Sequence, residues 1–144
     1  MNARTIWFWV TTGLLSFVMI SGGFSELTNL YGDTRQTTTL LGYPEYFLYI
    51  IGTWKIAAGI VILLPRLPLV KEWAYAGMFF NMTGAFASSI FMRNFEGGGY
   101  HPIAEASIAL LVVASWALRP ASGRLVDVFA RRPRFSEKPV AAAA

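Results

Sequence analysis

The chain contains four long stretches of apolar residues separated by polar segments. The stretches cover residues 6–23, 46–64, 73–92 and 102–118. A membrane-spanning helix needs about 20 predominantly apolar residues, with a range of roughly 17–25. The runs are continuous rather than alternating with a period of two, which disfavours a transmembrane barrel. The pattern therefore predicts an all-α fold, in which four transmembrane helices form an antiparallel bundle.

Composition agrees with this prediction, since 55% of the residues are apolar and only 14% are charged. A soluble domain carries about 25% charged residues. The first run also resembles a signal peptide, because Arg4 precedes it and small residues cluster over 21–23. It is longer than the roughly 7–15 residues of a signal-peptide core, which favours a transmembrane helix. We expect one membrane domain over 1–118 and a basic tail over 119–144.

Charge is distributed unevenly along the chain. The tail from Arg119 onward holds six cations and two carboxylates, which accounts for the whole formal net charge of +4. Because this tail directly follows an apolar run, the expected partner is the anionic lipid surface rather than nucleic acid. Arg4, the turn containing Arg66 and Lys71, and the tail would all lie on one side of the membrane. The positive-inside rule then places both termini in the cytoplasm.

The sequence holds no cysteine and a single histidine, His101. Thiolate metal sites, iron–sulfur clusters and a dithiol motif are therefore excluded, and one chain cannot give two histidine ligands to a haem. We identify no nucleophile–base pair, metal cluster or nucleotide loop. The expectation is a protein with no metal site, no intrinsic cofactor and no catalytic activity of its own.

One cation interrupts the second apolar run, and an ionised group at this depth is costly and usually functional. Lys55 lies nine residues after Tyr46, roughly 13 Å into the membrane at the helical rise of 1.5 Å per residue. Glu105, on the same outer side, is the first candidate for its counterion, and Glu26 is the second. The pair could be a buried ion pair that fixes helix register, or part of a ligand or proton site. Both interpretations stay open.

Asn81 falls near the middle of the third run, at a depth close to that of Lys55. A polar centre is therefore expected, formed by Lys55, Asn81, Glu105, Glu26, Tyr49 and His101. Three of them also have a simpler explanation: Asn81 can form a hydrogen bond between helices, Glu105 can stabilise a helix N-terminus, and His101 can lie in a solvent-exposed loop. Small residues that let helices approach closely are expected at Gly52, Gly59, Gly77, Gly84 and Ser88.

Several short motifs occur in order along the chain: Leu-Gly-Tyr-Pro-Glu over 41–45, Gly-Thr-Trp-Lys over 52–55, and Lys-Glu-Trp-Ala-Tyr-Ala-Gly over 71–77. With them, the chain up to about Leu118 resembles the DoxX-like family of small four-helix bacterial membrane proteins. The resemblance implies a four-helix transmembrane bundle in the inner (cytoplasmic) membrane. It also suggests a quinone ligand, by analogy with the membrane subunit of quinone-linked oxidation that names the broader family. The lack of cysteine departs from thiol-based roles in the wider family.

Three functional hypotheses follow. The first is a non-catalytic membrane subunit that binds a quinone or other isoprenoid lipid and assists a partner oxidoreductase. Lys55 and Asn81 would hydrogen-bond a carbonyl head group, with Glu105 or Glu26 as proton partner. The second is a small transporter or channel, which four spans would form only as a homo-oligomer. The third is a structural assembly factor whose buried ion pair merely orders the bundle.

Overall fold

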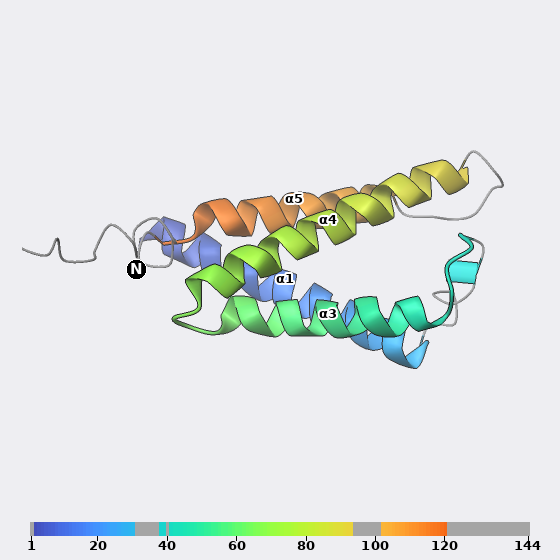
Figure 1. The fold of residues 1–144 in the computed structure, drawn as a ribbon. Helices are drawn as coiled ribbons and strands as arrows, with labels where there is room; N and C mark the ends of the chain where they lie inside the picture. The colour runs from blue at the N-terminus through green and yellow to red at the C-terminus, as the bar shows by residue number, and fades with distance from the viewer. Residues whose placement is uncertain (1, 31–37, 40, 94–101, 121–144) are drawn as a thin grey trace, which may run out of the picture.

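The computed structural model describes residues 2–30, 38–39, 41–93 and 102–120 (Figure 1). These residues form four helices and no strand. The helices are α1 (Ala3–Thr28), α3 (Tyr46–Leu63), α4 (Pro68–Arg93) and α5 (Pro102–Leu118). The all-α part of the prediction is confirmed, whereas the number of membrane crossings stays a prediction. The tail and His101 lie outside the described residues.

Local chemistry explains where the helices begin and end. Helix α1 ends at Asn29, which takes the left-handed conformation (φ 50°, ψ 38°) that asparagine tolerates better than most residues. Helix α3 ends at Leu64, whose extended backbone (ψ 136°) is the conformation favoured before Pro65. Proline begins both α4 and α5, where its missing N–H costs no helical hydrogen bond.

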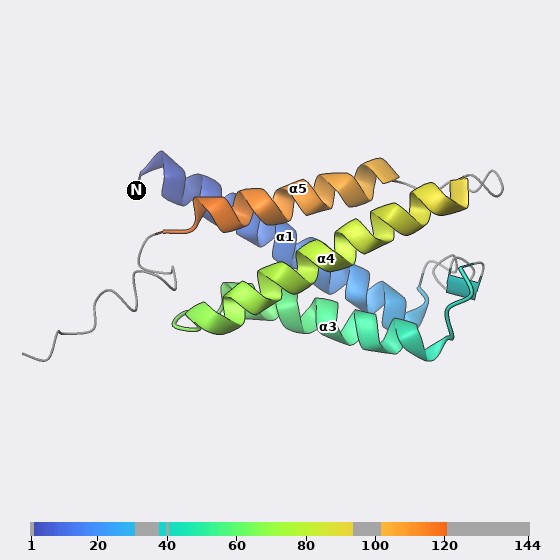
Figure 2. The same cartoon turned by 45° about the horizontal axis from the view of Figure 1, so that its top comes forward.

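The helices contact one another in a ring, with α1 against α3 and α5, and α4 against α3 and α5. Consecutive helices run in opposite directions (Figures 1 and 2). In both views α1 lies beside α5 at its N-terminal end and beside α3 at its C-terminal end. Helix α4 crosses the other way, from α3 near its start to α5 near its end. Each crossing helix therefore joins two different partners.

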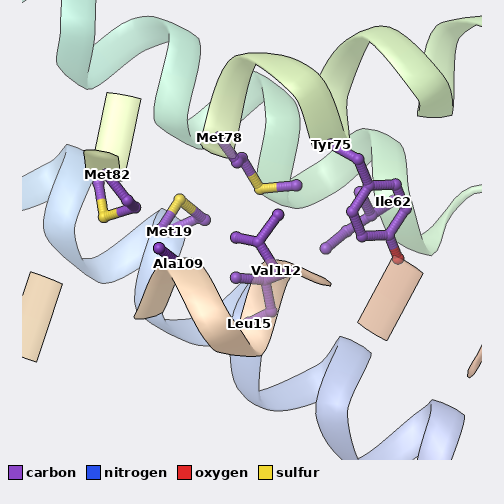
Figure 3. Close-up of a cluster of buried hydrophobic side chains, with 8 residues drawn as sticks. All are labelled: Leu15, Met19, Ile62, Tyr75, Met78, Met82, Ala109 and Val112. Carbon is purple, nitrogen blue, oxygen red and sulfur yellow. The ribbon is translucent and has the colours of Figure 1, made fainter. Parts of the chain in front are cut away.

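The centre of the bundle is an apolar cluster to which all four helices contribute (Figure 3). Its buried members are Leu15, Met19, Ile62, Tyr75, Met78, Met82, Ala109 and Val112. Three methionines gather here, and their flexible side chains fill irregular space between helices that cross at an angle. The cluster closes the middle of the bundle with apolar atoms.

The outside of the bundle is also apolar. Phe17, Phe80 and Ile103 are 70%, 71% and 81% exposed, and many other large apolar side chains face outward. Helices α1 and α3 are long and apolar enough to span a membrane, and only 33% and 22% of their most apolar stretches are buried. Helix α5 is a shorter apolar helix of 17 residues. A core helix of a soluble protein would be mostly buried, so these surfaces fit a lipid environment.

Candidate functional site

Lys55 is held by Glu26, and the two residues form the ion pair that joins α3 to α1. The ammonium of Lys55 donates to Oε1 of Glu26, and the side chains are only 16% and 13% exposed. Oε2 of Glu26 is buried and has no hydrogen-bond partner. An ammonium in an apolar interior is tolerable only when a charge of opposite sign neutralises it, and Glu26 meets that requirement.

Two glycines bring these charges together, because they let α1 and α3 approach closely. A Cβ atom at Gly23 would lie 2.5 Å from the carbonyl oxygen of Gly52, and one at Gly52 would lie 2.8 Å from that of Gly23. Glu26 and Lys55 each follow their glycine by three residues, so both stand beside the contact. Gly59 makes a second close approach, where an added Cβ would be 3.1 Å from the carbonyl oxygen of Ser16.

Glu105, the first candidate for the counterion, lies elsewhere. Its Oε1 accepts a hydrogen bond of 2.8 Å from Ser89 on α4, and its Oε2 is buried without a partner. The expected Lys55–Glu105 pair is therefore wrong. The physical reason is the crossing of the helices: α4 has reached α5 at this level, while α3 is paired with α1. Glu105 and Lys55 consequently belong to two separate polar contacts.

A pocket of about 330 Å³ lies between α3 and α4 and includes two of the residues predicted for the polar centre. Lys55 lines it from α3 and Asn81 from α4. The other lining residues are apolar or small: Ile51, Trp54, Ala57, Ala58, Val61, Val70, Trp73, Ala74, Gly77 and Met78. Ligand pockets are typically about 300–1,000 Å³, mostly apolar, with a few polar groups that orient the ligand. This pocket has that composition.

The polar groups sit toward one end of the pocket. Because α3 and α4 are antiparallel, Lys55 and Asn81 lie toward one end, and Val61 and Val70 lie toward the turn that joins the helices. The stretch from residue 51 to 61 spans about 15 Å at the helical rise. Oδ1 of Asn81 is buried and has no hydrogen-bond partner. The pocket is thus an apolar slot whose two polar lining residues, Lys55 and Asn81, lie nearer one end.

The remaining predicted residues take different positions. Tyr49 is exposed on α3, and its carbonyl accepts a hydrogen bond of 2.7 Å from Thr53. It does not line the pocket. Gly77 and Gly84 differ from the expected packing role, because both are exposed and an added Cβ would meet no atom within 4 Å. The face of α4 that packs is instead the one bearing Tyr75, Met78 and Met82. Gly77 lines the pocket.

Sequence reasoning missed a buried polar network near the other end of the bundle. The hydroxyl of Ser115 on α5 bonds those of Thr12 on α1 at 2.8 Å and Tyr75 on α4 at 2.9 Å. All three residues are buried. These hydroxyls sit at helix positions among apolar neighbours, and no signal in the sequence marks them as partners.

The same end of the bundle holds a second ion pair. Arg119, only 4% exposed, donates to Glu72 at 2.7 Å, and the indole of Trp116 donates to the other carboxylate oxygen at 2.9 Å. The guanidinium also lies 5.0 Å from the centre of the Tyr75 ring. Burial lowers the pKa of Lys71 from 10.5, and the nearby Arg119 charge lowers that pKa further. The basic tail thus begins at a fixed, buried arginine.

The described residues combine an all-helical fold, an apolar outer surface and a buried ion pair beside an apolar pocket, which are the features of a membrane protein. The comparison with protein families matches residues 10–115 to the DoxX-like family. The match covers well over half of the chain, so the protein belongs to the DoxX-like family. No curated protein and no solved structure matches the chain.

Proposed function

We propose that this protein is a non-catalytic membrane subunit that binds a quinone or related isoprenoid lipid between α3 and α4 and assists a partner oxidoreductase. In this proposal the four helices cross the bacterial inner membrane, and both termini are cytoplasmic. One observation carries the proposal: Lys55 and Asn81, on different helices, line the same apolar pocket. A lipid with a carbonyl head group and an apolar chain needs such a combination.

The chemistry of the pocket supports this ligand class. The Lys55 ammonium has three N–H donors, of which the Glu26 contact uses one. It can therefore also donate to a ligand carbonyl, and Asn81 adds a second polar side chain to the same lining. The small residues Ala58, Ala74 and Gly77 leave room in the pocket. Trp54 and Trp73 add aromatic surface on which a planar ring can stack.

The test of this function fills the pocket without touching its polar groups. In Gly77→Leu the new side chain has free space and is expected to occupy the pocket, because no atom lies within 4 Å of an added Cβ. A ligand that loses this space should lose about 1.4 kcal/mol of binding free energy or more, which corresponds to a tenfold loss of affinity. We expect quinone extracted from the purified protein, measured by mass spectrometry, to fall about tenfold.

The matched control is Gly84→Leu, the same change seven residues further along α4. Gly84 is equally open but does not line the pocket. This variant should retain quinone at the wild-type level. Wild-type protein without co-purifying quinone or isoprenoid lipid, or equal retention in both variants, would contradict the proposed function.

The structure supports the two alternative functions to different degrees. The assembly-factor hypothesis gains support from the position of the Lys55–Glu26 pair beside the tight contact of α1 with α3. It expects no bound lipid, so the same extraction separates it from the first proposal. The transporter or channel hypothesis gains none, because Met19, Met78 and their neighbours fill the bundle centre between the two polar ends. A homo-oligomer would have to form its pathway elsewhere.

A further inference from the structure

The pocket contains one charged side chain among its lining residues, Lys55. An unpaired ammonium in an apolar slot would attract anionic lipids above all others. The charge of Lys55 does not attract anions in this way, however, because Glu26 on α1 forms an ion pair with it. Glu26 does not line the pocket. A ligand in the pocket therefore lies beside a lysine whose charge Glu26 already neutralises.

We infer that Glu26 determines the selectivity of this pocket, because its pairing with Lys55 makes the polar end neutral and so favours uncharged, hydrogen-bonding head groups over anionic ones. This inference rests on the proposed lipid-binding function and specifies its ligand class. An anionic head group would bring a second negative charge close to the Glu26 carboxylate. It would also lose its hydration without an uncompensated cation in return, which is strongly unfavourable in an apolar site.

An uncharged head group faces no such cost. The ammonium retains N–H donors beyond the one that Glu26 uses, and Asn81 lines the same pocket. A hydroxyl, or the carbonyl–hydroxyl pair of a quinone and quinol, can hydrogen-bond these groups without carrying a charge. The ligand class is therefore neutral, amphipathic lipids with oxygen at the head.

The experiment uses two fluorescent probes that differ only at the head: a pyrenyl alkyl sulfonate, which is anionic at every working pH, and the pyrenyl alkyl alcohol of the same chain length. Binding of each to the full chain in detergent is followed by fluorescence titration. For the wild type we expect the alcohol to bind about tenfold more tightly than the sulfonate, or better.

Replacement of Glu26 by glutamine tests the cause of that preference. The change retains the shape of the side chain but frees the Lys55 charge, so the sulfonate should gain about tenfold in affinity while the alcohol changes little. In the double variant with Glu26→Gln and Lys55→Met no charge remains, and the gain for the sulfonate should vanish. The double variant thus separates the charge of Lys55 from any change in pocket shape.

Several outcomes would overturn the inference. Equal affinity of the wild type for both probes refutes the selectivity but leaves lipid binding in the pocket intact. The same holds if the glutamine variant gains nothing for the sulfonate. A wild type that binds neither probe overturns both this inference and the proposed function. If the glutamine variant does not fold, the two probes on the wild type alone still decide the selectivity.

Discussion

Lys55 and Glu105 show how differently two ionisable side chains are accommodated inside one bundle. The lysine has a full countercharge in Glu26, whereas Glu105 has a single hydrogen bond from the neutral hydroxyl of Ser89. Removing one partner of a buried ion pair leaves an uncompensated charge. Replacing a carboxylate by an amide that still accepts the same hydrogen bond leaves no such charge. The two carboxylates should therefore respond unequally to the same substitution.

We expect Glu26→Gln to lower the free energy of unfolding by about 3–5 kcal/mol, because it leaves the Lys55 ammonium without its countercharge. Glu105→Gln should cost less than about 1 kcal/mol, since the amide oxygen can still accept from Ser89. Thermal and denaturant unfolding in detergent would measure both. Adding Lys55→Met to the Glu26 variant should recover most of the loss. Equal losses of unfolding free energy in the two glutamine variants would show that the buried ion pair matters no more for stability than the Ser89–Glu105 hydrogen bond.

At the scale of the helices, the contact between α1 and α3 depends on glycines at the point of crossing. Two neighbouring glycines on α1 have opposite surroundings. Gly23 is buried against the backbone of Gly52, and Gly22 has no atom within 4 Å of an added Cβ. Backbone atoms cannot move aside as a flexible side chain can, so only the residue at position 23 must lack a Cβ.

Gly23→Ala should therefore force α1 and α3 apart and lower the free energy of unfolding by about 1–3 kcal/mol. Gly22→Ala is the matched control, and it should raise stability by roughly 0.5–1 kcal/mol because alanine favours the helix over glycine. Both are measured by thermal unfolding in detergent. If the two variants have the same stability, the close approach of the helices is not what stabilises this contact.

At the scale of the whole molecule, each end of the bundle is polar and the middle is apolar. The pairs Lys55–Glu26 and Ser89–Glu105 each join two helices toward one end. Toward the other end, Ser115 joins three helices through Thr12 and Tyr75. The buried apolar cluster lies between these ends. Such directional bonds hold the crossing helices together and fix their register.

Ser115→Ala should lower the free energy of unfolding by about 1–3 kcal/mol, because two buried hydroxyls lose their common partner. The control is Ser107→Ala on the same helix. Its exposed hydroxyl bonds only the carbonyl of Ile103 in its own helix, so the change should stay within about 0.5 kcal/mol. Unfolding midpoints of the two variants test this difference. A harmless change at position 115 would show that the network does not hold the helices together.

The membrane topology can be tested by cysteine labelling, because the chain has no native cysteine that would react. Single cysteines at exposed positions 44 and 67, before α3 and before α4, should lie on opposite sides of the membrane. A membrane-impermeant maleimide applied to intact cells should label Pro44→Cys, and should label Leu67→Cys only after lysis. Labelling of both from outside would contradict the proposed crossing of α3 and the cytoplasmic placement of the termini.

The sequence by itself determined the helical fold class, the apolar surface and the need of Lys55 for a countercharge. These follow from local properties, because a continuous apolar run can satisfy its backbone only as a helix, and a lone cation within it needs a partner. Sequence reasoning also placed Asn81 at the depth of Lys55, and the two now line one pocket. The DoxX-like family was identified from short motifs in the same way.

Only the tertiary structure decided which carboxylate neutralises Lys55 and which glycines pack. Depth along a helix can be counted from sequence, but it gives no information about which helices are neighbours or how they cross. Here the close approach of α1 and α3 at Gly23 and Gly52 brings Glu26 to Lys55. The crossing of α4 toward α5 places Ser89 where it donates a hydrogen bond to Glu105. Ion pairing and packing are relations between helices, so the arrangement of the helices had to be known first.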